Sequence, residues 1–228
     1  MEIQASIEQE NAALASEKWR SRPQIDMQQK FSFEVDTPNS MIQVSAPCAK
    51  TKLTFLQVLV NAAIEIGGEV LIIDCDNSIK CGLLLQYFSS EQLATCVHFY
   101  KIDQWETFCT FANIIPQLMF QLPNVAAIVV SGICNPYFYH QKRRCDKQIL
   151  SMTQFVNQQL DAMRRKFRYY QIPMFICQQQ ETDDADQWHS SLSGKIYYVK
   201  QNGDKCIVKL QKSPSEQALE INCDGDHQ

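Results

Sequence analysis

Two residue types that hold phosphate and magnesium in nucleotide sites stand next to each other after a short apolar run. Lys50 and Thr51 end the segment SAPCAKT, residues 45–51. An intact phosphate loop reads G-x-x-x-x-G-K-(S/T), because glycines let the backbone turn and aim its N–H groups at phosphate oxygens. This segment contains no glycine, and Pro47 lacks an N–H. It therefore indicates a degraded phosphate loop. The alternative for Lys50 is an ordinary surface lysine.

Three further residues end apolar runs where such a site would need polar groups. Asp76 follows the run VLIID, and its carboxylate could orient a water molecule. Ser131 follows the run AAIVV, where a magnesium site requires an aspartate. Gln179 follows the run MFIC, and a glutamine at this place can sense a terminal phosphate. The alternatives are that Asp76 and Gln179 merely end buried strands.

Short apolar runs alternate with longer segments of helical period, which predicts an α/β fold with a mostly parallel sheet flanked by helices. The predicted strands cover residues 41–45, 70–74, 97–101, 126–131 and 174–177, and the predicted helices cover 52–66, 105–121 and 147–170. Residues 195–200 and 205–211 surround the turn sequence QNGD and predict a C-terminal antiparallel hairpin. A short last strand is expected near 218–221.

The length of 228 residues suits one sizeable domain. We expect an α/β core over residues 41–228 and an N-terminal arm over residues 1–40, with one candidate helix at 5–19. No apolar run approaches the roughly 20 residues that span a bilayer, and the first residues lack the layout of a signal peptide. An intracellular protein without a membrane partner is expected.

The ten cysteines are scattered, and no two form a C-x-x-C pair. Several lie inside apolar runs, as Cys75 and Cys177 do, where a small hydrophobic residue would serve equally well. We therefore predict buried free thiols and no metal site.

Several segments resemble the RecA-type recombinases of eukaryotes and archaea and their paralogues. The segments are VLIIDCDNSIKCGLLLQYF at 70–88, the helical segment 147–160, the strand with Gln179 at 175–179, and KIYYVKQNGDKCIVKLQKSPSEQALEINCDG at 195–225. Trp188 and His189 resemble a pair that is common among the paralogues. The resemblance covers most of the chain from residue 41 onward, and it implies a single RecA-like core of the P-loop ATPase type.

The resemblance assigns roles to the residues at the predicted site. Lys50 and Thr51 fall on the phosphate-loop lysine and threonine, and Asp76 falls on the catalytic glutamate. Ser131 falls on the metal-site aspartate, and Gln179 falls on the sensor glutamine. Since two positions are altered and the loop has lost its glycines, we expect a pseudo-ATPase without efficient hydrolysis. Weak binding of ATP and magnesium at an interface shared with a partner stays open.

The family's first DNA-binding loop falls on residues 137–146, YFYHQKRRCD. Bases could stack on its aromatic rings, and its cations could hold phosphates. The candidate DNA-binding residues are Tyr137, Tyr139, Lys142, Arg143 and Arg144, and the alternative is a solvated charged turn. The second loop, at 181–186, is acidic, and the formal net charge of the chain is −4. We therefore expect contact with single-stranded DNA to be weak or indirect.

The resemblance implies a nuclear accessory subunit of homologous-recombination DNA repair. It would form a heterodimer with another recombinase paralogue and bind or remodel recombinase filaments on single-stranded DNA. One alternative is an active DNA-dependent ATPase of the same family, with groups supplied in trans. Another is a structural subunit of a different P-loop assembly. Mitotic and meiotic roles both stay open.

Overall fold

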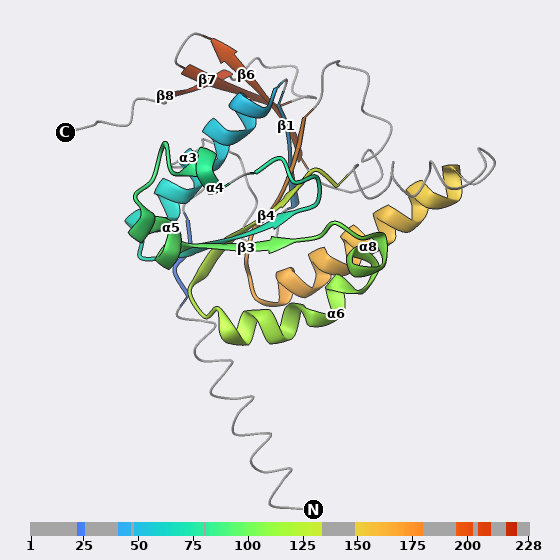
Figure 1. The fold of residues 1–228 in the computed structure, drawn as a ribbon. Helices are drawn as coiled ribbons and strands as arrows, with labels where there is room; N and C mark the ends of the chain where they lie inside the picture. The colour runs from blue at the N-terminus through green and yellow to red at the C-terminus, as the bar shows by residue number, and fades with distance from the viewer. Residues whose placement is uncertain are drawn as a thin grey trace, which may run out of the picture.

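A computed structural model describes residues 22–25, 41–46, 48–79, 81–133, 149–179, 195–202, 205–210 and 218–222. The strands are β1 (Met41–Ala46), β2 (Glu69–Asp74), β3 (Val97–Lys101), β4 (Val125–Ser131), β5 (Met174–Gln179), β6 (Lys195–Asn202), β7 (Lys205–Leu210) and β8 (Ala218–Asn222). The helices are α3 (Ala49–Glu65), α4 (Cys81–Leu84), α5 (Ser90–Cys96), α6 (Trp105–Gln121) and α8 (Ile149–Tyr169). Figure 1 shows the helices lying against a central twisted sheet.

The sheet has the strand order β3-β2-β4-β5-β1-β6-β7-β8. The pairs from β3 through β2, β4 and β5 to β1 are all parallel, and β6 is parallel to β1. β7 runs antiparallel to β6 and to β8. The predicted α/β class, with a mostly parallel sheet flanked by helices, is therefore confirmed.

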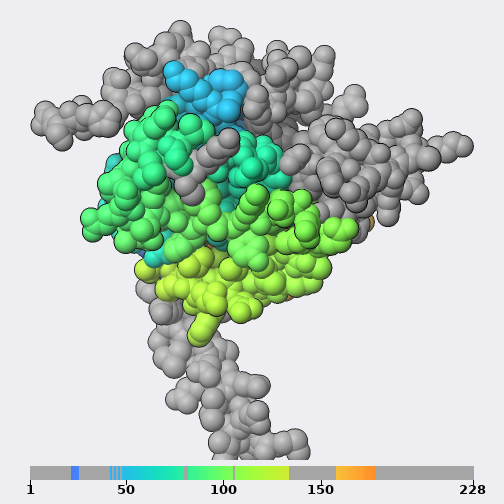
Figure 2. Space-filling model, in the orientation of Figure 1, coloured from blue at the N-terminus to red at the C-terminus, as the bar shows by residue number. Residues whose placement is uncertain are grey.

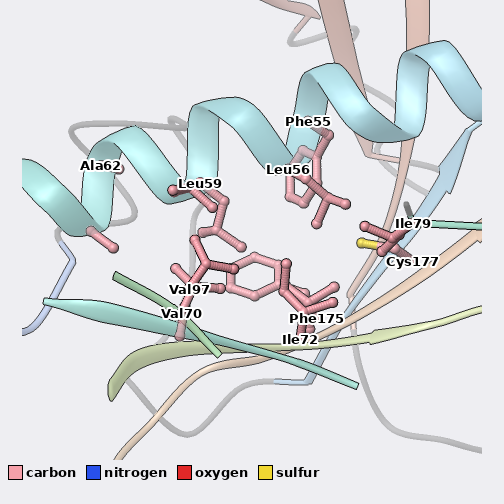
Figure 3. Close-up of a cluster of buried hydrophobic side chains, with 14 of the residues drawn as sticks. Phe55, Leu56, Leu59, Ala62, Val70, Ile72, Ile79, Val97, Phe175 and Cys177 are labelled. Atoms are coloured by element: carbon pink, nitrogen blue, oxygen red, sulfur yellow. The ribbon is translucent and has the colours of Figure 1, made fainter. Parts of the chain in front are cut away.

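Two apolar layers hold the helices to opposite faces of the sheet. In β2 and β4, alternate residues belong to different clusters, as Ile72 and Val129 do on one face and Ile73 and Val130 do on the other. The first cluster includes Phe55, Leu56 and Leu59 of α3, which Figure 3 shows above Ile72 and Phe175. The second cluster takes residues from α6 and α8. Both faces are covered, and for this reason the central strands are apolar throughout.

The predicted and observed elements differ mainly at two places. α3 begins at Ala49, three residues before the expected start of this helix at 52. α5 was not predicted, although its start carries a capping box: Gln92 N–H donates to the Ser89 hydroxyl, and Ser89 N–H donates to the Gln92 side chain. The segment with α5, β3 and α6 forms much of the surface in Figure 2.

Residues 22–25 of the expected N-terminal arm pack on the core. Arg22 is 7% exposed and Ile25 is 8% exposed. The Arg22 guanidinium donates from Nη2 to the Met119 carbonyl oxygen at 2.8 Å and lies over the Tyr170 ring, 5.7 Å from its centroid. The rest of the arm lies outside the described residues.

Candidate functional site

The candidate site lies where β2 and β4 end and α3 begins, because the parallel strands bring these ends to one edge of the sheet. Asp74, the last residue of β2, stands opposite Ser131, the last residue of β4. In the same way Ala46, at the end of β1, stands opposite Gln179, at the end of β5. This edge is the place where open α/β sheets bind their ligands.

Lys52 is the cation of this site. Its position in α3 is four residues before Leu56 and seven before Leu59, so helical spacing puts it on the buried face of the helix. Lys52 is only 1% exposed and is among the largest fully buried side chains. Lys50, two residues earlier, lies on the exposed side of the helix.

The Lys52 ammonium contacts three oxygen atoms from two strand ends. Nζ lies 3.1 Å from Ser131 Oγ and 3.4 Å from Asp76 Oδ2, and it also donates to Ser78 Oγ. An ammonium has three N–H donors, and three acceptors satisfy them. The buried positive charge is therefore both paired and hydrogen-bonded, which is the condition for keeping it out of water.

The turn after β2 presents Asp76 to the lysine. Asn77 adopts a positive φ of 56°, and the Ser78 N–H donates to Asp76 Oδ1 at 3.1 Å. Gly132, directly after β4, also has a positive φ of 67°. A Cβ atom at Gly132 would lie 1.9 Å from Asp76 Cγ. Glycine is required here because the Asp76 carboxylate lies against the Gly132 backbone.

A second carboxyl group, that of Asp74, lies behind the first. Asp74 is 4% exposed, and its Oδ1 has no hydrogen-bond partner among the described residues. Burial, then the hydrogen bond and charge of Asp76, raises the pKa of Asp74 to about 6. The pKa of Asp76 is lowered: burial opposes this, but hydrogen bonds from Asp74 and Ser78 and the charge of Lys52 outweigh it. When the pair binds one proton, Asp74 therefore holds it and Asp76 carries the negative charge.

The residues at the start of α3 make a contact of their own. Thr51 is fully buried, and its Oγ1 lies 3.3 Å from Cys48 Sγ. Side-chain and backbone hydrogen bonds from Thr51 lower the pKa of the Cys48 thiol. Cys48 is the N-cap of α3, but its side chain makes no capping hydrogen bond.

These residues do not fit a magnesium nucleotide bound in the usual way. Lys50 lies outside the network, and Lys52 is held by Asp76 and Ser131 instead of facing a phosphate. Ser131 supplies a hydroxyl where the metal would need a carboxylate. Among the residues that the structure describes, no group of three or more His, Cys, Asp or Glu side chains could hold a metal ion.

The structure brings together only part of the predicted site. Asp76 and Ser131 share one cation, whereas Lys50 does not reach them. Gln179 ends β5, but its side chain is outside the described residues. The candidate DNA-binding residues are also outside them: Tyr137, Tyr139, Lys142, Arg143 and Arg144.

Sequence reasoning missed Lys52 and Ser78. The signal for Lys52 was the helical period that places it in line with Leu56 and Leu59, rather than its position in a motif. Ser78 carried no signal of its own, since its contact depends on the turn after β2.

Within the described part of the chain, none of the helices has the length and apolar character needed to cross a membrane. The chain matches no protein-family model and no curated protein.

Proposed function

We propose that this protein is a recombinase-paralogue subunit with a pseudo-ATPase core, acting in homologous-recombination DNA repair. It pairs with another paralogue and binds recombinase filaments on single-stranded DNA. The observation that carries the proposal is the contact of Lys52 with Asp76 and Ser131. The positions that the resemblance assigns to catalysis and to metal binding are here joined to each other by a lysine.

The arrangement of the sheet supports a RecA-like core. The degraded phosphate loop connects β1 to α3, at the edge where β2 and β4 place Asp76 and Ser131. After the parallel strands, β6 and β7 form the antiparallel pair that the resemblance places at the end of the domain. These features agree with the family's pattern in order and in position.

A partner follows from the chemistry of this edge. In the family that the sequence resembles, nucleotide lies between neighbouring protomers. In this subunit Lys52 occupies the place where the nucleotide would bind, so we expect no ATP hydrolysis there. The same face can instead contact a protomer that has an intact nucleotide site. The expected setting is nuclear, and DNA is contacted weakly through residues 137–146 or through the partner.

Co-expression with recombinase paralogues tests this function. The expected result is a stable heterodimer that binds recombinase-coated single-stranded DNA and changes the stability of the filament. A partner with a mutated phosphate-loop lysine serves as the control, because it separates hydrolysis by the partner from hydrolysis by this chain.

Two results would contradict the proposal. Magnesium-dependent ATP turnover by the purified chain, lost in Lys50→Ala, would favour the active ATPase. A folded monomer that binds neither recombinase nor paralogues would favour a structural subunit of another P-loop assembly.

A further inference from the structure

The oxygen atoms around the Lys52 ammonium resemble the ligand set of a hard divalent cation. Asp76 supplies a carboxylate oxygen, and Ser78 and Ser131 supply hydroxyl oxygens. Asp74 adds a buried carboxyl group with one oxygen that has no partner among the described residues. Carboxylate, hydroxyl and water oxygens are the ligands that magnesium, manganese and calcium prefer.

The ammonium is the only positive charge in contact with these oxygens among the described residues. It has one charge and three donors, so it satisfies one carboxylate and the two hydroxyls, and Asp74 Oδ1 has no hydrogen-bond partner among the described residues. A divalent cation carries enough charge to pair with both carboxylates, and the carboxyl group of Asp74 is hydrogen-bonded to that of Asp76.

We propose that Lys52 is a built-in cation, which holds this edge of the sheet together in place of a divalent metal ion. Removing its side chain turns the oxygen cluster of Asp74, Asp76, Ser78 and Ser131 into a site for manganese or magnesium. This inference concerns the chain alone and does not depend on the proposed role in recombination.

Thermal unfolding of the Lys52→Ala variant tests the proposal. Without metal, its melting temperature should lie roughly 6–20 °C below that of the wild type, since the partly buried Asp76 carboxylate is left without its cation. Manganese at about a hundred times its dissociation constant should raise the melting temperature of the variant by roughly 5–11 °C. The wild type should melt at the same temperature in manganese and in a chelator.

The matched control is Lys101→Ala, which removes an exposed lysine at the end of β3, at the same edge of the sheet. It should behave as the wild type does. A manganese-dependent rise of equal size in the wild type or in Lys101→Ala would overturn the proposal, because the metal would then bind elsewhere.

A double variant keeps the proposal testable where Lys52→Ala alone does not fold. Lys52→Ala with Asp76→Asn removes both charges, so it should fold, melt above the single variant and gain little from manganese. If the double variant melts no higher than the single variant, the charge of Lys52 is not what matters and the proposal fails. It also fails if Asp76→Asn restores stability but neither manganese nor magnesium does, because Lys52 would then be an ordinary buried ion-pair partner.

Discussion

Lys52 and Arg22 are two buried cations at opposite ends of the strands of one sheet, and their charged groups have different contacts. Lys52 lies at the carboxyl edge and has a carboxylate and two hydroxyl groups around its ammonium. Arg22 lies near the amino edge, where its contacts are the carbonyl oxygen and sulfur of Met119 and the ring of Tyr170. No ion pair to Arg22 is found among the described residues, and its Nε has no hydrogen-bond partner there.

The difference shows in the energetic cost of each charge. Burial lowers the pKa of the Arg22 guanidinium to about 10, although Tyr170 and Glu69 act in the opposite direction. A buried charge that no carboxylate contacts directly destabilises the fold, and hydrogen bonding and ring stacking only partly offset that cost. Arg22 therefore serves to hold its segment against α6 and against Tyr170, which follows α8, whereas Lys52 is needed for its charge.

Replacing each cation by methionine should give the largest effect and should separate the two roles. Lys52→Met leaves the partly buried Asp76 carboxylate without its cation and should lower the free energy of unfolding by about 3–5 kcal/mol. Arg22→Met loses one carbonyl hydrogen bond and the ring contact, but also a poorly compensated charge, so the loss should be about 1–2 kcal/mol. Urea unfolding of both variants measures the difference. Equal decreases in the free energy of unfolding would show that the two cations stabilise the fold to the same extent.

Alanine substitutions at two glycines with the same backbone conformation test whether the Asp76 carboxylate has room to move. Gly67 and Gly132 have φ values of 68° and 67°, but a Cβ atom at Gly67 would meet nothing within 4 Å. Gly67→Ala should cost about 1–2 kcal/mol from the backbone alone. Gly132→Ala must also displace the Asp76 carboxylate from Lys52, so we expect about 2–4 kcal/mol. Chemical denaturation of the pair measures this, and a Gly132→Ala loss no larger than that of Gly67→Ala would mean that Asp76 is free to move.

The raised pKa of Asp74 predicts a smaller effect, a decrease in the free energy of unfolding as the pH rises. Its folded pKa of about 6 lies above the ordinary value of 3.8, so its contribution to stability is complete below the ordinary value and is lost as pH rises through 6. The lowered pKa of Asp76 acts only at lower pH. Between about pH 5 and 7 the wild type should therefore lose about 1 kcal/mol more stability than Asp74→Asn, whose amide cannot ionise. Denaturant titrations of both proteins at both pH values check this. If the two proteins lose the same stability between these pH values, Asp74 is not the group that titrates.

The burial and pKa of three cysteine thiols lead us to expect different rates of alkylation. Burial raises the pKa of Cys75, and it raises the pKa of Cys177 to about 12. Cys48 is partly exposed, and the hydrogen bonds from Thr51 lower the pKa of its thiol. Brief alkylation of the native protein, read by peptide mass spectrometry, should label Cys48 and leave Cys75 and Cys177 unmodified. Labelling of Cys177 before Cys48 would mean that the core between α3 and the sheet opens readily.

Much of the fold could be predicted because the apolar pattern is unambiguous. The bounds of β3 and α6 agree with those predicted, and the other parallel strands differ by one or two residues at an end. α5 was missed because none of its residues is buried, which leaves the capping box as its only signal.

The candidate site was less predictable than the strands that carry it. Asp76 and Ser131 could be placed at one edge because parallel strands align their ends. The motif led to Lys50, but a motif assumes an intact loop, and here the helix starts at Ala49 and turns Lys52 inward. Whether Lys50 or Lys52 is buried depends on which face of α3 packs against the sheet.

The packing of residues 22–25 has a practical consequence for handling the protein. Pro23 lies near Gly68, just before β2, and the side chain of Arg22 reaches the last turn of α6. Residues 22–25 therefore pack near the amino end of β2, at the opposite end of the strands from Lys52. A fluorophore attached at Gln24, which is exposed, would lie on that side, so labelling there suits experiments in which the opposite ends of the strands have to meet a partner.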